Sequence, residues 1–329
     1  MKNIKVGING FGRIGRTLFR ILNQRKGVDV VAVNDLAELA SVVHLLKYDS
    51  IHRTLQADLH ISENSFSING SVVKYSQESD LANLSWGDCD VVVECTGKFL
   101  AKVDLQKHLA AGARKVILSA PPVGDGVKMV VLGVNDHILS ASDAIVSNAS
   151  CTTNSAAPMV QLMDAFFGVN QAYITTIHSY TTDQSLHDSP HKDLRRARAG
   201  ALSIIPTTTG AAKAVSKIFP DLEIGGCGIR VPVPNGSLTD ITFIVKNSCT
   251  IEQVNQVFLN ASKNSHKNYL SYTEDPIVSV DVVGSSSSCL FDSQLTSVLG
   301  KMVKIVSWYD NETGYANRLA DLVFRLHQQ

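Results

Sequence analysis

The chain has 329 residues, which is long for a single hydrophobic core, so two domains are expected. Apolar residues make up 44% and charged residues 18%, a composition typical of a globular protein rather than a disordered one. The 30 basic and 30 acidic residues cancel, so bulk charge favours neither a nucleic acid nor an anionic membrane as a partner. No run of about 18 apolar residues predicts a transmembrane helix, and we expect no secretory signal in the first ten residues.

Six cysteines are scattered along the chain, and none belongs to a CxxC pair. This spacing predicts neither a metal site nor a disulfide framework, and it favours a reduced, cytoplasmic setting. The cysteines are Cys89, Cys95, Cys151, Cys227, Cys249 and Cys289.

Short apolar strands alternate with amphipathic helices in the first half of the chain. Strands are expected at residues 5–9, 28–34, 90–95, 115–119, 129–134 and 144–147, and helices at residues 13–24 and 103–111. Continuously apolar strands that are linked by helices predict a parallel sheet covered on both faces, as in the doubly wound α/β (Rossmann) architecture.

The pattern changes near residue 150, where strands begin to alternate apolar and polar residues. Strands are expected at residues 172–178, 226–233, 238–245, 279–283 and 304–309, and helices at residues 152–166, 210–219, 251–263 and 313–326. This pattern predicts an α+β domain with a mostly antiparallel sheet and helices on one face. Residues 181–201 follow neither period, and a long irregular segment of this kind is often functional.

A GxGxxG motif formed by Gly10, Gly12 and Gly15 follows the first predicted strand and opens the first predicted helix. The first glycine permits a tight turn, the second lets a pyrophosphate approach the backbone, and the third lets helix and strand pack closely. Asp35 ends the second predicted strand, where its carboxylate would bind ribose hydroxyls and repel a 2′-phosphate. We therefore expect NAD rather than NADP, and this context disfavours a simple glycine-rich turn.

Cys151 lies at the junction of the two halves, where polar residues precede an apolar helical stretch. A thiol at a helix N-terminus feels the positive end of the helix dipole, which is expected to lower its pKa. His178 ends a predicted strand, and an imidazole beside the thiol would stabilise a thiolate and transfer protons. The alternatives are a buried structural cysteine and a surface histidine, because sequence spacing does not bring the two side chains together.

Three further segments offer groups that bind anions. A basic cluster spans residues 191–198, hydroxyls at residues 207–209 precede a predicted helix at Gly210, and Arg230 lies on a predicted strand. Hydroxyls and amides at a helix N-terminus bind phosphate, and arginine binds it in a bidentate manner. These groups predict a phosphorylated substrate, while the alternative for the basic cluster is a solvated loop or a subunit interface.

Six distinctive motifs are spread over nearly the whole chain. They are residues 8–16 (INGFGRIGR), 45–49 (LLKYD), 150–154 (SCTTN), 193–199 (DLRRARA), 207–213 (TTTGAAK) and 308–312 (WYDNE). Together they resemble the motifs of phosphorylating glyceraldehyde-3-phosphate dehydrogenases.

The resemblance implies a role for each matching position. It implies that Cys151 is the nucleophile and His178 its base, and that Thr181 and Arg230 hold the substrate phosphate. The residues implied to hold inorganic phosphate, or a second position of the same group, are Ser150, Thr152, Arg196, Thr209 and Gly210. The residues expected to contact NAD are Gly10, Gly12, Arg13, Ile14, Asp35, Ser119 and Asn311.

The resemblance also implies an organisation and an activity. Residues 1–149 and 312–329 would form the NAD-binding domain and residues 150–311 the catalytic domain of a homotetramer, with the loop at 181–201 reaching toward a neighbouring subunit. The implied reaction converts D-glyceraldehyde 3-phosphate and inorganic phosphate to 1,3-bisphosphoglycerate through a thioester, in glycolysis or gluconeogenesis. Erythrose-4-phosphate dehydrogenase is the alternative, and no metal, nucleic acid or membrane is expected as a partner.

Three positions depart from the family pattern. Ser155 stands where many members have a second cysteine, and Ser189 stands before Pro190 where NAD-specific members usually have leucine. Gly236 stands where valine is expected. Pro190 and Asp35 keep NAD favoured.

Overall fold

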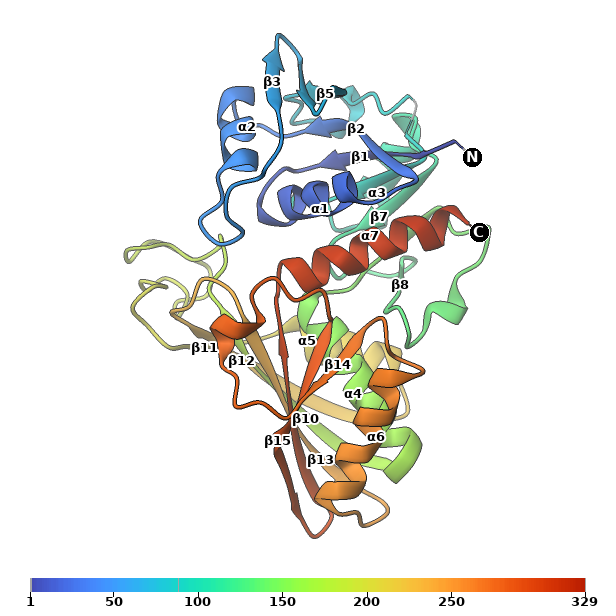
Figure 1. Cartoon of the computed structure of the whole chain (residues 1–329), viewed down its shortest axis with the longest axis vertical. Coiled ribbons are helices and arrows are strands. Elements are labelled where there is room, and N and C mark those ends of the chain that lie inside the picture. The colour runs from blue at the N-terminus through green and yellow to red at the C-terminus, as the bar shows by residue number, and fades with distance from the viewer. Residues whose placement is uncertain (1, 88, 329) are drawn as a thin grey trace. The chain divides into compact units, whose positions relative to one another are not determined.

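The computed structural model describes residues 2–87 and 89–328, so Met1, Asp88 and Gln329 of the predicted NAD-binding domain lie outside the described residues. The chain divides into two compact units (Figure 1). Unit 1 comprises Met1–Val130, His137–Ala149 and Ala316–Gln329, and unit 2 comprises Val131–Asp136 and Ser150–Tyr315.

Unit 1 is built on a sheet whose described strands run in the order β3-β4-β5-β2-β1-β6-β7-β9-β8. Its central strands are parallel, so the expected Rossmann sheet is confirmed. The strands are β1 (Ile4–Asn9), β2 (Val28–Asn34), β3 (Leu59–Ser62), β4 (Ser65–Ile68), β5 (Ser71–Ser76), β6 (Val91–Glu94), β7 (Lys115–Leu118), β8 (Lys128–Met129) and β9 (Ile145–Ser147). The helices are α1 (Arg13–Gln24), α2 (Leu39–Lys47), α3 (Lys102–Ala110) and most of α7 (Thr313–His327).

Three features of unit 1 differ from the sequence prediction, and the first is that helix α2 was not predicted. The strand expected at residues 129–134 is wrong, because β8 ends at Met129 and Val131–Asp136 belongs to unit 2. The antiparallel strands β3, β4 and β5 were not predicted. Asn69 and Gly70, with φ of 49° and 85°, form the tight turn between β4 and β5, and an Asn-Gly pair between alternating strands is the signal that could have revealed it.

Unit 2 contains a second sheet, whose described strands run in the order β11-β12-β10-β13-β16-β15-β14. Most neighbouring pairs are antiparallel, whereas β10 pairs with β12 and β14 with β15 in parallel, so the expected mostly antiparallel sheet is confirmed. The strands are β10 (Val169–Ser179), β11 (Ile205–Thr207), β12 (Glu223–Val231), β13 (Ser237–Val245), β14 (Leu270–Thr273), β15 (Cys289–Leu299) and β16 (Met302–Tyr309). The helices are α4 (Cys151–Phe167), α5 (Gly210–Ile218) and α6 (Ile251–Lys263). Of the 3-10 turns in the described residues, Leu81–Asn83 lies in unit 1, Ser279–Val282 lies in unit 2, and Asp136–Ile138 spans a point where the chain passes from one unit to the other.

The core of unit 2 lies between its sheet and its helices. Met163 of α4, Phe258 of α6, and Phe243 and Phe291 of the sheet are buried in one apolar cluster. The rings of Phe258 and Phe291 stack with centroids 4.0 Å apart. Burial of one sheet face explains why the strands of this half alternate apolar and polar residues.

The strand expected at residues 279–283 is wrong. The segment forms the 3-10 turn Ser279–Val282, in which the Asp281 carboxylate accepts a hydrogen bond from the Val278 amide at 2.8 Å. The next strand, β15, was not predicted, because its middle residues are polar and its pairing with β16 is irregular between Asp292 and Ser297. Among the described residues, no helix is both long and apolar enough to cross a membrane.

A buried polar network ties together the ends of three parallel strands in unit 1. The Glu94 carboxylate at the end of β6 accepts hydrogen bonds from Asn9 of β1 at 2.5 Å and from His108 Nε2 at 3.0 Å. The Asn34 amide of β2 donates to Asn9 at 2.8 Å, and the Trp86 indole donates to His108 Nδ1 at 3.0 Å. Because an indole only donates, Nδ1 is unprotonated and Nε2 carries the ring proton toward Glu94. The network therefore holds the strand ends from which the glycine loop begins.

Replacement of His108 by alanine would leave the Glu94 carboxylate and the Trp86 indole buried with one partner fewer. We expect a loss of about 2–5 kcal/mol in unfolding free energy, measured by urea denaturation. The exposed His137→Ala serves as the control and should change stability by less than about 0.5 kcal/mol. A His108→Ala variant as stable as the control would show that the network does not support the fold.

Candidate active site

Cys151 is the first residue of α4, and the helix begins there because Ser150 caps it. The Ser150 hydroxyl accepts a hydrogen bond from the Thr153 amide at 3.0 Å, which is the usual role of a serine at this position. The sulfur of Cys151 lies 3.4 Å from Nε2 of His178. The two side chains that the sequence could not connect are therefore in contact.

His178 is held rigidly near the end of β10. Its ring is buried, with 7% of the residue exposed, so the alternative of a surface histidine is wrong. Tyr309 of β16 packs edge-on against the ring at a centroid distance of 6.0 Å. The Tyr309 hydroxyl lies 2.9 Å from the hydroxyls of Thr152 and Thr176, which fixes the ring that supports His178.

The electrostatics of the thiol differ from the sequence prediction. Burial raises the pKa of Cys151, and the opposing effects of Arg230, Thr152 and the backbone amides at the helix start do not overcome it. The expected lowering by the helix N-terminus is therefore present but outweighed. Burial, followed by the charge of Arg230, lowers the pKa of His178 to about 3, so both partners are neutral at pH 7.

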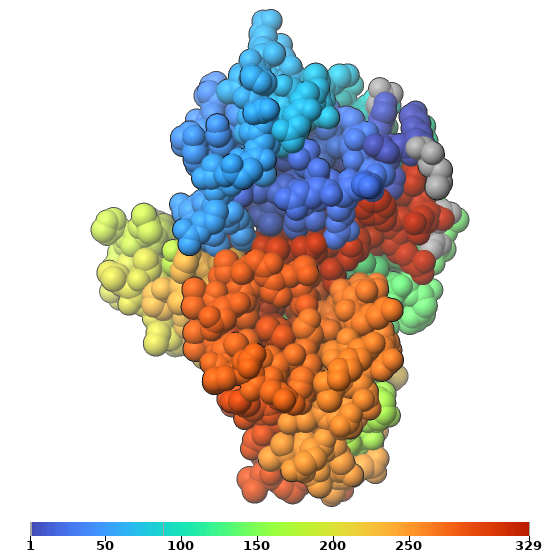
Figure 2. All heavy atoms as spheres, in the orientation of Figure 1, coloured from blue at the N-terminus to red at the C-terminus, as the bar shows by residue number. Residues whose placement is uncertain are grey.

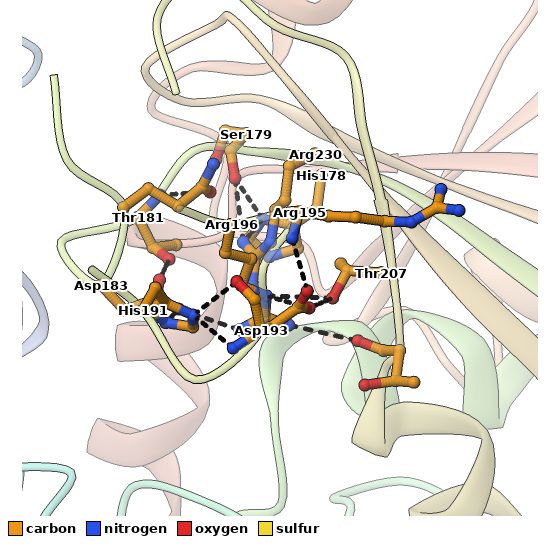
Figure 3. Close-up of polar contacts among 12 residues, drawn as sticks. His178, Ser179, Thr181, Asp183, His191, Asp193, Arg195, Arg196, Thr207 and Arg230 are labelled. Atoms are coloured by element: carbon orange, nitrogen blue, oxygen red, sulfur yellow. Dashed lines mark hydrogen bonds and ion pairs between the residues drawn. The ribbon is translucent and has the colours of Figure 1, made fainter. Parts of the chain in front are cut away.

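Arg230 of β12 approaches the same ring from the side opposite Cys151. His178 and Arg230 are register partners on the parallel strands β10 and β12. The guanidinium Nη1 of Arg230 lies 2.7 Å from His178 Nδ1 and 3.0 Å from the carbonyl oxygen of Ser179, as Figure 3 shows. A cation, an imidazole and a thiol thus form one continuous row.

An irregular loop at residues 180–204 follows β10, and its yellow-green atoms stand out at the surface of unit 2 in Figure 2. Within the loop, the Asp183 carboxylate accepts hydrogen bonds from the Thr181 hydroxyl and from Arg196, the latter at 2.9 Å. Burial alone would raise the pKa of Asp183, but Thr181, Arg230 and Arg196 outweigh burial and lower it. The negatively charged Asp183 carboxylate therefore contacts both Thr181 and Arg196, which are two of the predicted phosphate ligands.

Arg196 also reaches the segment that precedes α5. Its Nε donates to the Thr207 hydroxyl at 3.0 Å and its Nη2 to the Thr208 carbonyl at 3.2 Å. Thr209 caps α5 by accepting the Ala211 amide at 3.2 Å. The space beside Gly210 is open, because a Cβ built there would meet no atom within 4 Å. Hydroxyls and helix-start amides here can hold an anion.

The structure therefore brings only some of the predicted substrate residues into contact with one another. Cys151, His178 and Arg230 are in contact, and Thr181 and Arg196 meet at Asp183. Thr152 is buried, and its hydroxyl faces Tyr309 in the interior, while its backbone amide lies beside the Cys151 thiol at the helix start. Sequence reasoning assigned no role to Asp183, and an acidic residue in an irregular loop gives no signal of its partners.

The glycine loop of unit 1 has the shape that a dinucleotide requires. Gly10 has φ of 89°, and a Cβ on Gly15 would lie 2.2 Å from the Gly10 carbonyl oxygen, so only glycine fits at either position. A Cβ on Gly12 would meet nothing within 4 Å, and no side chain caps α1 there. The start of α1 is thus open to a pyrophosphate, which its amides and dipole favour.

Asp35 lies directly beside this loop. Its Oδ2 accepts the Phe11 amide at 2.6 Å and its Oδ1 accepts the Ala37 amide at 3.0 Å, which leaves further lone pairs for ribose hydroxyls. Arg13 and Ile14 open α1, and the Arg13 guanidinium forms an ion pair with Asp49 at 2.6 Å. These contacts fit the adenosine end of a dinucleotide.

The other two predicted cofactor residues lie at element ends. Ser119 follows β7, and its amide donates to the Glu94 carbonyl at 3.0 Å. In unit 2, the Asn311 Oδ1 accepts hydrogen bonds from Ser179 at 3.0 Å and Ser237 at 2.8 Å. Hydrogen bonds from both hydroxyls thus hold the Asn311 amide in place.

Ser155, one of the departures, is buried in unit 2. Its hydroxyl lies 2.9 Å from that of Ser307 and accepts from Thr239 at 3.0 Å. The buried hydroxyl of a serine at this position therefore has hydrogen-bond partners. Gly236 has φ of 85°, and a Cβ there would lie 2.1 Å from the Ser279 carbonyl oxygen, so the neighbouring turn accounts for glycine in place of valine.

Comparison with known proteins gives consistent results for both halves. Residues 4–102 match the family model described as glyceraldehyde 3-phosphate dehydrogenase, NAD binding domain, and residues 150–311 match the C-terminal domain of the same family. The chain is 50% identical over 326 residues to glyceraldehyde-3-phosphate dehydrogenase 2 of Streptomyces avermitilis. It is 48% identical over 325 residues both to glyceraldehyde-3-phosphate dehydrogenase of Geobacillus stearothermophilus and to glyceraldehyde-3-phosphate dehydrogenase 1 of Bacillus subtilis.

Each of these alignments covers 97% of this chain and 97% of the relative. With an NAD-binding glycine loop in unit 1 and a cysteine–histidine pair in unit 2, the chain belongs to the glyceraldehyde-3-phosphate dehydrogenase family.

Proposed function

We propose that this NAD-dependent dehydrogenase oxidises D-glyceraldehyde 3-phosphate and uses inorganic phosphate to form 1,3-bisphosphoglycerate through a thioester on Cys151. The observation that carries the proposal is the 3.4 Å contact between Cys151 Sγ and His178 Nε2, with Arg230 on the far side of the ring. A nucleophile, a base that touches it and a cation for a phosphate are the groups that such a reaction needs.

In the first half of the reaction, the Cys151 sulfur attacks the aldehyde carbon and forms a hemithioacetal. The amide at the start of α4 and the His178 ring stabilise the developing oxyanion. NAD, when bound, supplies the acceptor for the hydride that leaves this carbon. His178 Nε2 takes the hydroxyl proton as the hydride leaves, and the product is a thioester.

In the second half, phosphate replaces sulfur. Arg196, Thr209 and the start of α5 would hold inorganic phosphate, whose oxygen attacks the thioester carbonyl carbon. Cys151 leaves as a thiolate and regains a proton from His178. Thr181 and Arg230 would meanwhile hold the phosphate of the substrate itself.

The roles of individual residues, the domain bounds and the cellular setting are part of the same proposal. We propose the NAD contacts of Gly10, Gly12, Arg13, Ile14, Asp35, Ser119 and Asn311, and the phosphate contacts of Ser150 and Thr152, as expected from the sequence. We also propose residues 1–149 and 312–329 as the NAD-binding domain and residues 150–311 as the catalytic domain. Free cysteines support a cytoplasmic setting, and the reaction supports a place in glycolysis or gluconeogenesis.

Omission of inorganic phosphate tests the proposal directly. With NAD and glyceraldehyde 3-phosphate alone, absorbance of NADH should rise in one burst of about one equivalent per site, because the thioester is cleaved only slowly by water. Added phosphate should restore steady turnover. Steady turnover without phosphate would contradict the proposal, and faster oxidation of erythrose 4-phosphate than of glyceraldehyde 3-phosphate would assign a different substrate.

Replacement of the nucleophile tests its role. Cys151→Ser should lower kcat on the order of 10⁵-fold or more, because a serine hydroxyl is far less nucleophilic at neutral pH. Cys249→Ser, in the segment between β13 and α6, is the matched control and should keep kcat within about twofold. NADH formation by Cys151→Ser at the control rate would refute the thioester mechanism.

We further propose that the chain assembles as a homotetramer through the loop at residues 180–204. Leu194 and Leu202 are 81% and 83% exposed in the single chain, and a neighbouring subunit that covered them would remove this apolar surface from water. A variant with both replaced by aspartate should sediment as a smaller species than the wild-type tetramer of 35.5 kDa chains. Val72→Asp, an exposed position in the β4–β5 hairpin, should leave the sedimentation coefficient unchanged. Equal sedimentation of all three proteins would exclude this surface as an interface.

A further inference from the structure

The last residues of β1 and β6 lie side by side at the carboxyl edge of the parallel sheet of unit 1, where Asn9 and Glu94 are register partners. Strand β2 follows β1 on one side and β7 follows β6 on the other, so the direction of the crossovers reverses between β1 and β6. In open parallel sheets, ligands bind in the crevice at such a switch point. The fully buried Glu94 carboxylate therefore lies at the edge of the crevice in which a dinucleotide would bind.

The neighbouring strand and helix present hydrogen-bond donors to this carboxylate. The Asn34 Oδ1 accepts the Glu78 backbone amide at 2.8 Å, so the Asn34 Nδ2 faces the Oδ1 of Asn9. This orientation turns the Asn9 Nδ2 toward Glu94, at 2.5 Å. On the other side, the ring of His108 presents its Nε2–H at 3.0 Å. Because both groups donate, the carboxylate accepts their hydrogen bonds in its ionised form.

The third group on the carboxylate is the turn that follows β6. Glu94 Oε1 accepts hydrogen bonds from the Thr96 amide, at 2.7 Å, and from the Thr96 hydroxyl. The same hydroxyl accepts the Lys98 amide at 3.1 Å, so one buried side chain holds the whole turn. The turn packs against the glycine loop, because a Cβ on Gly10 would lie 2.6 Å from the Thr96 nitrogen. A displacement of the turn would therefore be transmitted to the glycine loop.

We propose that Glu94 is a positioning residue for NAD, whose carboxylate holds the turn at residues 95–98 against the glycine loop so that the two together fit the pyrophosphate region of the dinucleotide. This inference rests on the proposed contacts of Gly10 and Gly12 with NAD. Glu94 is fully buried, so it acts through the turn and does not touch the cofactor. The turn itself is open to a ligand, because a Cβ on Gly97 would meet no atom within 4 Å. A turn that is ordered before binding reduces the entropy lost when the cofactor binds.

Glutamine has nearly the shape of glutamate but cannot replace it in this network. If the glutamine oxygen faced Thr96, its NH₂ group would face the donors of Asn9 and His108. If the side chain were turned round, the NH₂ group would face the Thr96 amide. Either orientation leaves at least one buried donor without an acceptor. The turn in Glu94→Gln would therefore relax in the free protein, and NAD would have to restore it on binding.

The test is the dissociation constant of NAD, measured by isothermal titration calorimetry without aldehyde or phosphate. Glu94→Gln should raise this constant about tenfold or more, because restoring the turn opposes binding. Hydrogen exchange without NAD, followed by mass spectrometry, should be faster than in the wild type in peptides that cover residues 95–98. Peptides from unit 2 should exchange as in the wild type.

Trp86→Phe is the matched control within the same network. It removes the indole that donates to His108 Nδ1 and leaves a smaller side chain in the core, so it lowers stability, but the hydrogen bonds to the Glu94 carboxylate remain. This variant should bind NAD within about twofold of the wild type and keep the turn protected from exchange. A purely structural role of the network would instead weaken NAD binding in both variants, in proportion to the stability that each has lost.

A pair of substitutions at Thr96 decides the question if Glu94→Gln does not fold. Thr96→Val removes the hydroxyl that links Glu94 to the Lys98 amide while keeping the size of the side chain, and it should raise the dissociation constant about fivefold. Thr96→Ser keeps the hydroxyl and should stay within about twofold of the wild type.

Equal NAD affinity of the wild type and a folded Glu94→Gln variant would overturn the inference, as would equal affinity of the two Thr96 variants. A loss of affinity in Trp86→Phe as large as that in Glu94→Gln would also overturn it. The proposed function is tested on the wild-type protein, by its requirement for phosphate, so it stands or falls independently of these variants.

Discussion

The contact between Cys151 and His178 is the interaction on which the catalytic unit depends. A thiol that is buried at the start of α4 has a raised pKa, because desolvation disfavours the thiolate more than the helix amides favour it. Arg230 contributes charge but has no lone pair with which to take a proton. The imidazole at 3.4 Å is the group in contact with the sulfur that can do so. Tyr309 and Arg230 contact this ring and help to hold it in place.

The lengths of two consecutive elements explain why the pair meets. Helix α4 has 17 residues and so carries the chain about 25 Å away from Cys151, at roughly 1.5 Å per residue. Strand β10 then returns, and it regains that distance within about eight residues at roughly 3.3 Å each. His178 is the tenth of the 11 residues of β10, close to the point where the strand again reaches the start of α4. A separation of 27 residues thus becomes a direct contact through ordinary helix and strand geometry.

Much of the fold could be predicted, because most strands have clear periodicity. In β10, Ile174, Thr176 and His178 alternate with more exposed residues, and all three are buried. The same criterion misassigned residues 279–283, where an acidic side chain caps a 3-10 turn, and it overlooked β15, whose middle residues are polar. Local hydrogen bonds of Asp281 and an irregular register in β15 override a pattern that reflects burial alone.

The site was harder to predict, because the register between strands β10 and β12 decides which side chains contact each other there. Sequence reasoning selects Cys151, His178 and Arg230 as candidates, but a shift of one residue between β10 and β12 would turn Arg230 to the other face of the sheet. In the observed register the guanidinium reaches the same ring nitrogen as the Ser179 carbonyl oxygen. Neither the composition nor the spacing of the sequence predicts that these two groups meet at one ring nitrogen. The neighbours of this ring nitrogen, rather than residue types alone, therefore set the electrostatics of the group that contacts the buried thiol.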